Sequence, residues 1–311
     1  MTAVAAPDVA ILLSVFDGDR FIDQQLDSIA AQRGVRWSLT WRDDGSDPRR
    51  SSAASLEAFR ARFPTQVFAV GSPAGRVGVS ASYRTLLGQA PEAAYIAFAD
   101  QDDVWLPDKL SRAVSRLAGL DGPALYCGRQ TLVDARLAPL GLSKVPLRPL
   151  GFANALVQNV ATGCTMVLNH AARDAVRAMP APEGTLHDWW AYLVVAGIGG
   201  HLVYDAEPFI LYRQHDRNAV GSSGGTVTRA IRALRRGPGP FLDSLDHHLR
   251  QLLAYRDRLT PDNQRMLDAL WAARSAPPMR RPGAVMGARV YRQGTLEDLL
   301  LRAWLMLRSA R

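Results

Sequence analysis

Three carboxylates stand within four residues, directly after a short apolar run. Residues 95–99 are apolar and aromatic, which is typical of a buried strand. Asp100, Asp102 and Asp103 follow, and Pro107 then opens a segment whose apolar spacing predicts a helix. Clustered acids repel one another unless a cation or hydrogen-bond donors hold them. The pattern favours a ligand site at the end of this strand, with simple helix capping as the alternative.

The same order of strand, acidic turn and helix occurs earlier in the chain. Residues 9–15 are a continuous apolar run that predicts a buried parallel strand, and residues 37–41 predict a second strand. Helical spacing follows each of them. The predicted fold class is therefore α/β, with a mostly parallel sheet flanked by helices. Such sheets bind ligands at the carboxyl ends of their strands, so we expect Asp17, Asp44 and Asp102 to face one crevice.

The second half of the chain predicts shorter elements. We expect strands over residues 124–127, 130–133, 162–168, 202–204 and 209–213, and helices over residues 152–157 and from 187 onward. The composition changes beyond Gly221, where a Ser/Gly run predicts a link. We expect one domain over residues 1–221, with halves of about 1–110 and 111–221. A helical region is expected over 222–311, with helices at 228–236, 242–259, 261–274 and 296–307 and a loop at 276–282.

Positive charge is concentrated at the C-terminal end. Residues 1–225 hold 21 Lys+Arg against 22 acids, whereas residues 226–311 hold 16 Arg against 7 acids. A basic tail suits an anionic membrane surface or a nucleic acid, and a solvated helical face is the plainer alternative. The sequence shows no signal-peptide pattern and no apolar stretch long enough to span a bilayer. We expect a cytoplasmic protein, either free or bound to a membrane surface.

The acidic segment also indicates a cofactor. Carboxylate oxygens are the ligands that Mg²⁺ and Mn²⁺ prefer, and Asp102 is the first choice of ligand, supported by Asp100 and Asp103. Neither a G-x-G-x-x-G after the first strand nor a Walker lysine loop is present. Phosphates would then be met by a metal rather than by a glycine-rich helix start.

Residues 99–110 resemble the D-x-D region of the family 2 glycosyltransferases, especially their rhamnosyltransferase-like branch, which reads S-D-Q-D-D-x-W-x-P-x-K-L. This chain has Ala99 at the first position, and further matching segments cover residues 9–221, about seven tenths of the chain. The resemblance implies a GT-A fold and inverting, metal-dependent transfer. It implies a nucleoside diphosphate sugar as donor, with dTDP-L-rhamnose as the leading choice. The implied acceptor is a bacterial surface glycan or glycolipid, and the basic tail would then dock on the inner membrane.

On the donor side, the resemblance implies a site made of residues near the strand ends. Asp44 stands in a D-D-G-S segment and would grip the pyrimidine or the ribose, with Asp43 as the weaker candidate; a turn aspartate is the alternative. Phe16 would stack on the base, with core packing as an equal alternative. Ser14 and Asp100 complete the predicted donor set.

A second motif supplies the candidate base. Asp188 lies in a His187-Asp188-Trp189-Trp190 segment that resembles the H-D-W-W of the family, where the aspartate is the general base. An apolar wall beside it would exclude water, and the tryptophan faces could also pack on sugar rings. Helix capping by Asp188, with both tryptophans in the core, is the alternative.

Further segments complete the predicted site. His215 lies in a Y-R-Q-H segment like that of the family and would complete the metal shell or contact the diphosphate, a structural histidine being the alternative. Arg213 would pair with a phosphate or an acid. Thr162 and Gly163 match the T-G-C of the family and would line the acceptor side.

Two other function classes remain open from the sequence. A sugar-nucleotide pyrophosphorylase also holds Mg²⁺ with carboxylates, but a glycine-rich basic loop usually follows its first strand, and this chain has Phe16-Asp17-Gly18-Asp19 there. A nucleic-acid or scaffold protein would act through the arginine tail. That tail matches no recognised nucleic-acid motif, so we expect no nucleic-acid partner.

Overall fold

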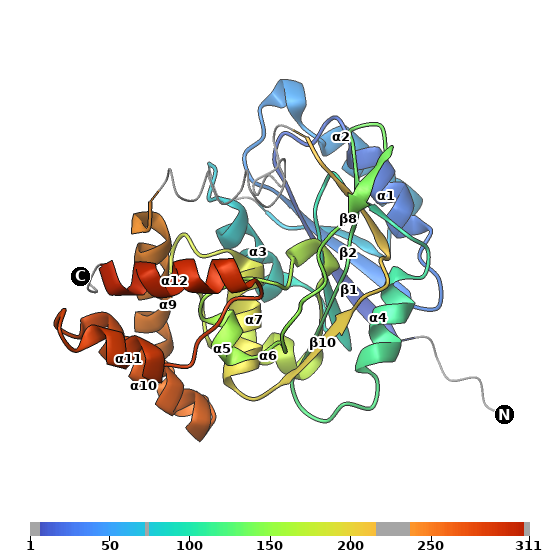
Figure 1. Cartoon of the computed structure of the whole chain (residues 1–311). Helices are drawn as coiled ribbons and strands as arrows, with labels where there is room; N and C mark the ends of the chain where they lie inside the picture. Colours follow the sequence, from blue (N-terminus) through green and yellow to red (C-terminus); the bar gives the residue numbers. More distant parts are fainter. Residues whose placement is uncertain (1–6, 72–74, 216–236, 308–311) are drawn as a thin grey trace.

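The computed structural model describes residues 7–71, 75–215 and 237–307. Within these residues a seven-stranded sheet has the order β10-β6-β9-β4-β1-β2-β3 (Figure 1). Its strands are β1 (Asp8–Val15), β2 (Arg36–Asp43), β3 (Val67–Ala69), β4 (Tyr95–Ala99), β6 (Ala124–Gly128), β9 (Val167–Asn169) and β10 (His201–Asp205). β9 runs antiparallel to β4 and β6, and the other pairs are parallel. The predicted mostly parallel sheet is confirmed.

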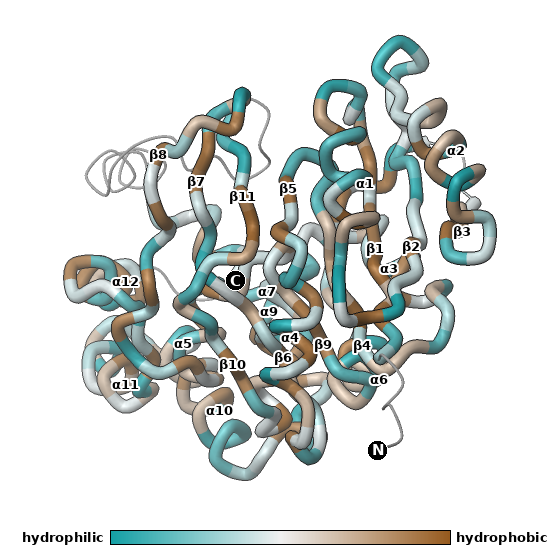
Figure 2. Tube along the Cα trace, turned by 90° about the vertical axis from the view of Figure 1, so that its right-hand side faces the viewer, coloured by the Kyte–Doolittle hydropathy of each residue, from teal (hydrophilic) through white to brown (hydrophobic). Residues whose placement is uncertain are grey.

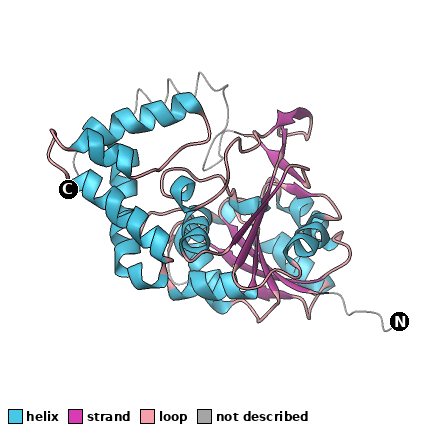
Figure 3. Cartoon of the chain, turned by 60° about the horizontal axis from the view of Figure 1, so that its bottom comes forward, coloured by secondary structure: helices cyan, strands magenta, loops and turns pink. Residues whose placement is uncertain are grey.

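Helices cover both faces of this sheet, as Figure 3 shows. Successive residues of β1 point to opposite sides, so Ala10 and Leu12 enter one core while Ile11 and Leu13 enter the other. The second of these cores is closed by α1 (Ile22–Ala30), α2 (Ala53–Arg62) and α4 (Lys109–Leu117). The first is closed by α3 (Val79–Gln89), α5 (Phe152–Ala155), α6 (His170–Ala178) and α7 (His187–Gly197). Figure 2 shows the apolar segments gathered along the strands and inner helices.

A smaller sheet brings residues 210–213 back to the acidic segment. Within the described residues it has four strands in the order β5-β11-β7-β8. They are β5 (Val104–Trp105), β7 (Thr131–Val133), β8 (Pro139–Leu142) and β11 (Ile210–Arg213). β11 pairs antiparallel with β5, with Leu211 opposite Val104. The segment that follows β11 therefore lies beside the acids that follow β4.

The C-terminal helices are α9 (Gly239–Ala254), α10 (Pro261–Ser275), α11 (Arg281–Gly287) and α12 (Thr295–Leu307). Apolar residues of all four share one core with α3, α5, α6 and α7. In Figure 1 they form the end of the molecule away from α1 and α2. The helix predicted over residues 228–236 lies outside the described residues. The division into two domains stays a prediction.

Two local predictions are corrected by the structure, and one helix was not predicted. Residues 162–168 are not one strand, because Gly163–Thr165 forms a 3-10 turn whose first N–H donates to Asp188 instead of to a neighbouring strand. Residues 276–282 are not all loop, because α11 begins at Arg281 with Pro282 in its first turn, where proline is well tolerated. Helix α6 was not predicted; Asn169 caps it by accepting from the Ala172 N–H.

A buried ion pair joins α9 to α10. Arg274 donates to both oxygens of Asp246 (2.8 and 2.9 Å), and their side chains are 0% and 6% exposed. We expect Asp246→Asn to lower the free energy of unfolding by about 3–5 kcal/mol, because it leaves a buried guanidinium without its counter-charge. Urea denaturation measures this loss. Replacing both partners with apolar residues of similar size should cost far less, and an equal cost would contradict the explanation.

Candidate active site

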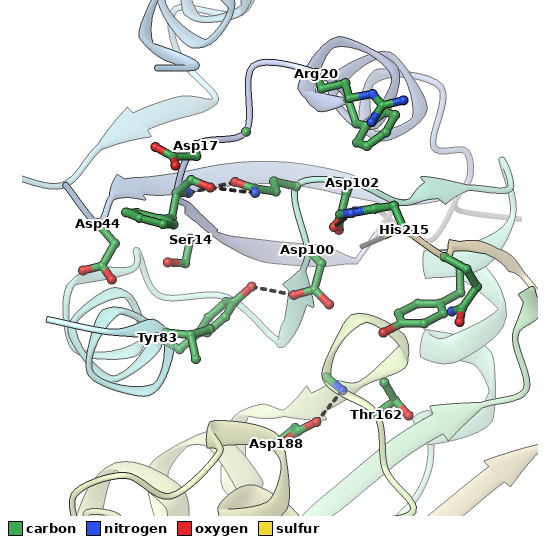
Figure 4. Close-up of a pocket in the computed structure, with 18 of the residues that line it drawn as sticks. Ser14, Asp17, Arg20, Asp44, Tyr83, Asp100, Asp102, Thr162, Asp188 and His215 are labelled. Atoms are coloured by element: carbon green, nitrogen blue, oxygen red, sulfur yellow. Dashed lines mark hydrogen bonds and ion pairs between the residues drawn. The ribbon is translucent and has the colours of Figure 1, made fainter. Parts of the chain in front are cut away.

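A cavity of about 1060 Å³ opens at the carboxyl ends of β1, β2 and β4. Segments that follow these strands line it, together with α3, the start of α7 and the segment after β11. In Figure 4, Asp44 and Ser14 lie toward one end, Asp102 and His215 toward the other, and Asp188 lies on the side of Asp100 away from Asp17. The expected convergence of Asp17, Asp44 and Asp102 on one crevice is confirmed.

Asp44 is firmly held where the cavity meets the end of β2. It is 2% exposed, and Oδ1 accepts from Arg42 (2.8 Å) and from the Val77 N–H (2.9 Å), while Oδ2 accepts from the Gly78 N–H (2.8 Å). Its carboxylate thus ties the segment before α3 to the end of β2. Because a carboxylate oxygen can accept two hydrogen bonds, Oδ2 retains capacity for a donor group of a ligand in the cavity.

Ser14 belongs to the same network. Its hydroxyl donates to Ser82 Oγ (2.6 Å), which also accepts from Arg42 (2.9 Å). Asp43 does not line the cavity. Its Oδ1 accepts from the N–H and hydroxyl of Ser46 (2.9 and 2.8 Å), which makes Asp43 the turn aspartate of this segment.

Phe16 lines the cavity and its backbone is clamped by Gln101. The Phe16 N–H donates to Gln101 Oε1 (2.8 Å), and Gln101 Nε2 donates to the Phe16 carbonyl (2.9 Å). A side chain at Gly18 would come within 2.5 Å of Gln101 Oε1, so this clamp requires glycine there. The Arg76 guanidinium lies over the Phe16 ring, 3.8 Å from its centroid. An arginine therefore covers one face of the ring that was predicted to stack on a base.

Asp17 is held at the rim of the cavity. It has a positive φ of 51° and pairs with Arg50 at 2.7 Å, and its Oδ1 accepts from the Asp47 N–H (3.0 Å). These contacts join the turn after β1 to the turn after β2. A fixed turn of this kind shapes this part of the cavity wall.

The acids after β4 have different surroundings. Asp100 is partly buried and accepts from the Tyr83 hydroxyl (3.2 Å); desolvation, then the charges of Asp102 and Asp188, raises its pKa to about 7. Asp103 is fully buried, and its Oδ1 accepts from the Arg213 N–H (3.1 Å). Burial, reinforced by Asp102 and Asp100, raises the pKa of Asp103 well above its usual range. Asp100 therefore faces the cavity and Asp103 supports the fold behind it.

Two arrangements near these acids could hold a metal. Asp102 Oδ2 lies 2.8 Å from His215 Nε2, and both residues line the cavity beside Asp100. Ligand atoms of Asp100, Asp103 and Cys164 also lie within 4.8 Å of one another. In this second group, burial raises the pKa of the Cys164 thiol, and neither Asp103 nor Cys164 lines the cavity. The carboxylate and imidazole set of Asp100, Asp102 and His215 fits a hard divalent cation better and can be reached by a ligand's phosphates.

Asp188 lies in the first turn of α7 and lines the cavity. Oδ1 accepts from the Trp189 N–H (2.6 Å) and Oδ2 from the Gly163 N–H (2.9 Å). A side chain at Gly163 would meet His187 Nε2 at 2.9 Å, so the absence of a side chain lets Asp188 and His187 approach. The N-cap of α7 is Leu186 and not Asp188, but Asp188 accepts from an N–H of the first turn and lines the cavity at the same time.

The other residues of the H-D-W-W segment support this wall. The His187 ring stacks on Tyr83 with centroids 3.8 Å apart, and burial lowers its pKa to about 4. Trp190 is buried and donates to the Met179 carbonyl, while Trp189 donates to the Ala155 carbonyl. Neither tryptophan lines the cavity, so their rings are not placed to pack on a sugar there.

Arg213 is a buried clamp and not part of the cavity lining. It donates to the carbonyls of Asp102 and Ala135 (both 2.7 Å) and to Gln24, and lies over the Phe21 ring. Its guanidinium reaches the Asp102 carbonyl and its own N–H reaches the Asp103 carboxylate, and these bonds fix β11 against the loop after β4. Thr162, by contrast, lines the cavity beside Gly163.

Several lining residues were not predicted. Tyr83 donates to the Ala99 carbonyl (2.5 Å) and contacts Asp100, and Gln101 joins β1 to β4. Arg76, Asp134 and Tyr212 also line the cavity. The sequence offered a signal for Gln101, since it stands between the two acids of the D-x-D motif. It offered none for Tyr83, which has the spacing of an apolar residue in a helix.

The C-terminal helices brace the start of α7. His248 of α9 is fully buried, its Nε2 lies 3.1 Å from Thr185 Oγ1, and its ring meets Trp189 edge-on at 4.9 Å. Burial lowers the pKa of His248 to about 4 from an ordinary value of 6.5. The folded state thus excludes a proton that the unfolded chain binds, and stability falls as the pH drops from about 6.5 to 4.

We expect His248→Gln to remove this part of the pH dependence, because glutamine cannot be protonated and can still bond Thr185. The wild type should lose about 3 kcal/mol more than the variant between pH 7 and pH 4. Urea denaturation at each pH measures the difference. Parallel pH profiles for the two proteins would contradict the role of His248.

Comparisons with known proteins agree with this geometry. Residues 11–153 match the family model "Glycosyl transferase family 2". Residues 11–153 therefore form a glycosyltransferase family 2 domain. It is 25% identical over 227 residues to the dTDP-rhamnosyl transferase RfbG of Shigella flexneri, covering 68% of this chain and 74% of that protein. It is 24% identical over 166 residues to the UDP-Glc:alpha-D-GlcNAc-diphosphoundecaprenol beta-1,3-glucosyltransferase WfgD of Escherichia coli, covering 51% and 59%.

Solved structures show the same fold at lower identity. TarS of S. aureus in complex with UDP-GlcNAc has a TM-score of 0.61 at 11% identity, covering 90% of this chain and 79% of that one. The mannosyltransferase PcManGT of Pyrobaculum calidifontis in complex with GDP-Man and Mn²⁺ has a TM-score of 0.54 at 19% identity, covering 96% and 79%. The chain therefore has the GT-A fold, and the comparisons support a glycosyltransferase rather than a pyrophosphorylase or a non-catalytic nucleic-acid protein.

Proposed function

We propose that this glycosyltransferase moves a sugar from a nucleoside diphosphate donor to a hydroxyl of a bacterial surface glycan, with inversion at the anomeric carbon. The observation that carries the proposal is that Asp188 and the Asp100–Asp102–His215 group line one cavity from different elements. The S. flexneri relative favours dTDP-L-rhamnose as donor. The E. coli relative is described as acting on a diphosphoundecaprenol-linked sugar, which supports a lipid-linked acceptor at the cytoplasmic face of the inner membrane.

Each end of the cavity would have its own task. The donor's base would lie by Asp44 and Ser14, with Asp44 Oδ2 accepting from a pyrimidine N–H or a ribose hydroxyl. Asp100, Asp102 and His215 would hold a divalent cation, Mg²⁺ or Mn²⁺. When bound, that ion neutralises the charge of the diphosphate leaving group. Asp103 and Arg213 would keep the acidic loop in position from behind.

Asp188 would act as the general base. The acceptor oxygen forms a bond to the anomeric carbon as its proton passes to Asp188, and the bond from that carbon to the diphosphate breaks with its electron pair leaving on the diphosphate. The N–H groups of Trp189 and Gly163 hold both carboxylate oxygens in fixed directions, so the base does not have to be ordered during the reaction. Thr162 and Gly163 would border the acceptor.

A donor panel tests the proposal. Purified protein is incubated with dTDP-L-rhamnose, UDP-glucose or GDP-mannose, Mn²⁺ and a lipid-diphosphate-linked sugar, and the product linkage is determined by NMR. We expect transfer from dTDP-L-rhamnose with inverted configuration. Transfer from another donor would change the sugar assignment, and retained configuration would remove Asp188 from the role of a single-step base.

A further inference from the structure

Large apolar side chains gather on the solvent side of α11 and α12. Leu296, Leu299 and Leu307 of α12 are 68%, 65% and 70% exposed, and Met286 of α11 is 61% exposed. The three leucines recur at helical spacing and share one side of α12. The other side of α12 is buried in the core through Leu301, Trp304 and Leu305. This helix is therefore apolar toward the core and toward the solvent.

The acids of α12 are turned away from its exposed side. Glu297 accepts from Gln158 (3.2 Å), and Asp298 accepts from the Arg292 N–H (2.8 Å) and from Arg302 (3.3 Å). Among the described residues, the outward stripe of α12 at 296, 299, 303 and 307 has no acid. Its apolar side chains thus reach the solvent without a carboxylate between them.

Arginines frame these apolar groups. Arg280 and Arg289 are exposed at the two ends of α11. Arg302 donates to Met286 Sδ (3.5 Å), which brings the exposed sides of α11 and α12 together. Figure 1 shows the two helices side by side at the end of the molecule farthest from the N-terminus. Residues 276–311 hold seven arginines against two acids, and both acids make the inward contacts described above.

We infer that this surface docks on an anionic phospholipid bilayer. It is called the α11–α12 face and comprises Met279, Met286, Leu296, Leu299, Met306 and Leu307 with Arg280 and Arg289. Exposed leucines and methionines enter the boundary between headgroups and acyl chains, and arginines at the rim pair with anionic headgroups. A second copy of the chain is a poorer occupant, because an isologous contact brings the arginines of the two copies together. Among the described residues, no helix is both long and apolar enough to cross a membrane.

The inference rests on the proposed function only for the biological reason to bind a membrane, since a lipid-linked acceptor would be met at such a surface. Binding to vesicles needs neither donor nor acceptor. A protein that binds vesicles without transferring sugar would refute the proposed function alone. A protein that transfers sugar without binding vesicles would refute this inference alone.

Vesicle flotation of the full chain tests the inference. Vesicles of phosphatidylcholine are compared with vesicles that also contain phosphatidylglycerol, at low and high salt. The triple variant Met286→Ser, Leu296→Ser, Leu299→Ser is compared with Leu140→Ser, Leu142→Ser, which changes exposed leucines of β8 instead. We expect flotation with phosphatidylglycerol vesicles that weakens with salt, and at least about tenfold weaker binding of the triple variant alone.

Each other outcome would overturn the inference. Wild-type protein that stays unbound with anionic vesicles removes the bilayer as partner. Equal vesicle binding by the triple variant and the wild type would mean that another surface makes the contact. A dimer in size-exclusion chromatography that the triple variant abolishes, without vesicle binding, assigns the face to a second copy. Unchanged binding of a nucleoside diphosphate by both variants serves as the check that they are folded.

Discussion

Asp188→Asn is expected to lower the rate of sugar transfer by about 10²–10⁴-fold, the range typical of losing a general base. Asparagine keeps the size of the side chain and one acceptor for the N–H groups of Trp189 and Gly163, but it cannot take the proton of the acceptor hydroxyl. The variant should bind the donor diphosphate about as well as the wild type, because Asp188 lies apart from Asp44 and Asp102. Steady-state kinetics and calorimetric titration with the diphosphate measure the two quantities.

The contact of Asp188 with the first turn of α7 needs its own control. An acid in the first turn of a helix is favourable, so the variant will also be somewhat less stable. Thr260 is the N-cap of α10, and its hydroxyl accepts from the Asn263 N–H away from the cavity. Thr260→Ala removes this cap. We expect Thr260→Ala to lose stability and keep its transfer rate. If Asp188→Asn behaves in the same way, Asp188 stabilises the first turn of α7 and is not a base.

The sheet could be predicted because its signals are local. β1 and β4 are continuous apolar runs that end at acids, and both are buried central strands. The acids that follow parallel strands must share one edge of the sheet, so the meeting of Asp17, Asp44 and Asp102 followed from topology. Short elements were harder to predict, since the conformation of a stretch such as Gly163–Thr165 depends on its contacts with α7.

The contacts inside the site could not be predicted, because they join distant parts of the chain. Gln101 bonds the backbone of Phe16, 85 positions earlier, and His248 reaches Thr185 across 63 positions. No periodicity in the sequence encodes such pairs. Arg76 over Phe16 is a similar case, since a stacked arginine leaves no pattern that differs from a surface arginine.

The motif residues fall into two groups, those whose side chains line the cavity and those whose side chains hold the surrounding backbone. Asp44, Asp100, Asp102, Asp188 and His215 line the cavity, as the resemblance implied for ligand-binding groups. Asp43 closes a turn and Arg213 clamps two backbone carbonyls, so both shape the site without lining it. A sequence motif indicates that its residues belong to one site. Whether each one touches a ligand or holds its neighbour depends on the fold around it.

Asp102→Ala is expected to abolish the metal dependence of donor binding. The wild type should bind dTDP at least about tenfold more tightly with Mn²⁺ than without, and this gain should be lost in Asp102→Ala and reduced in His215→Ala. The reason is that Asp102 and His215 meet at 2.8 Å on the cavity wall, where the diphosphate would lie. Asp108→Ala is the matched control, because it removes an exposed acid of the same segment outside the cavity. Equally tight dTDP binding without Mn²⁺ would mean that other groups meet the diphosphate, and Arg20 and Arg76 of the lining would be the next residues to replace.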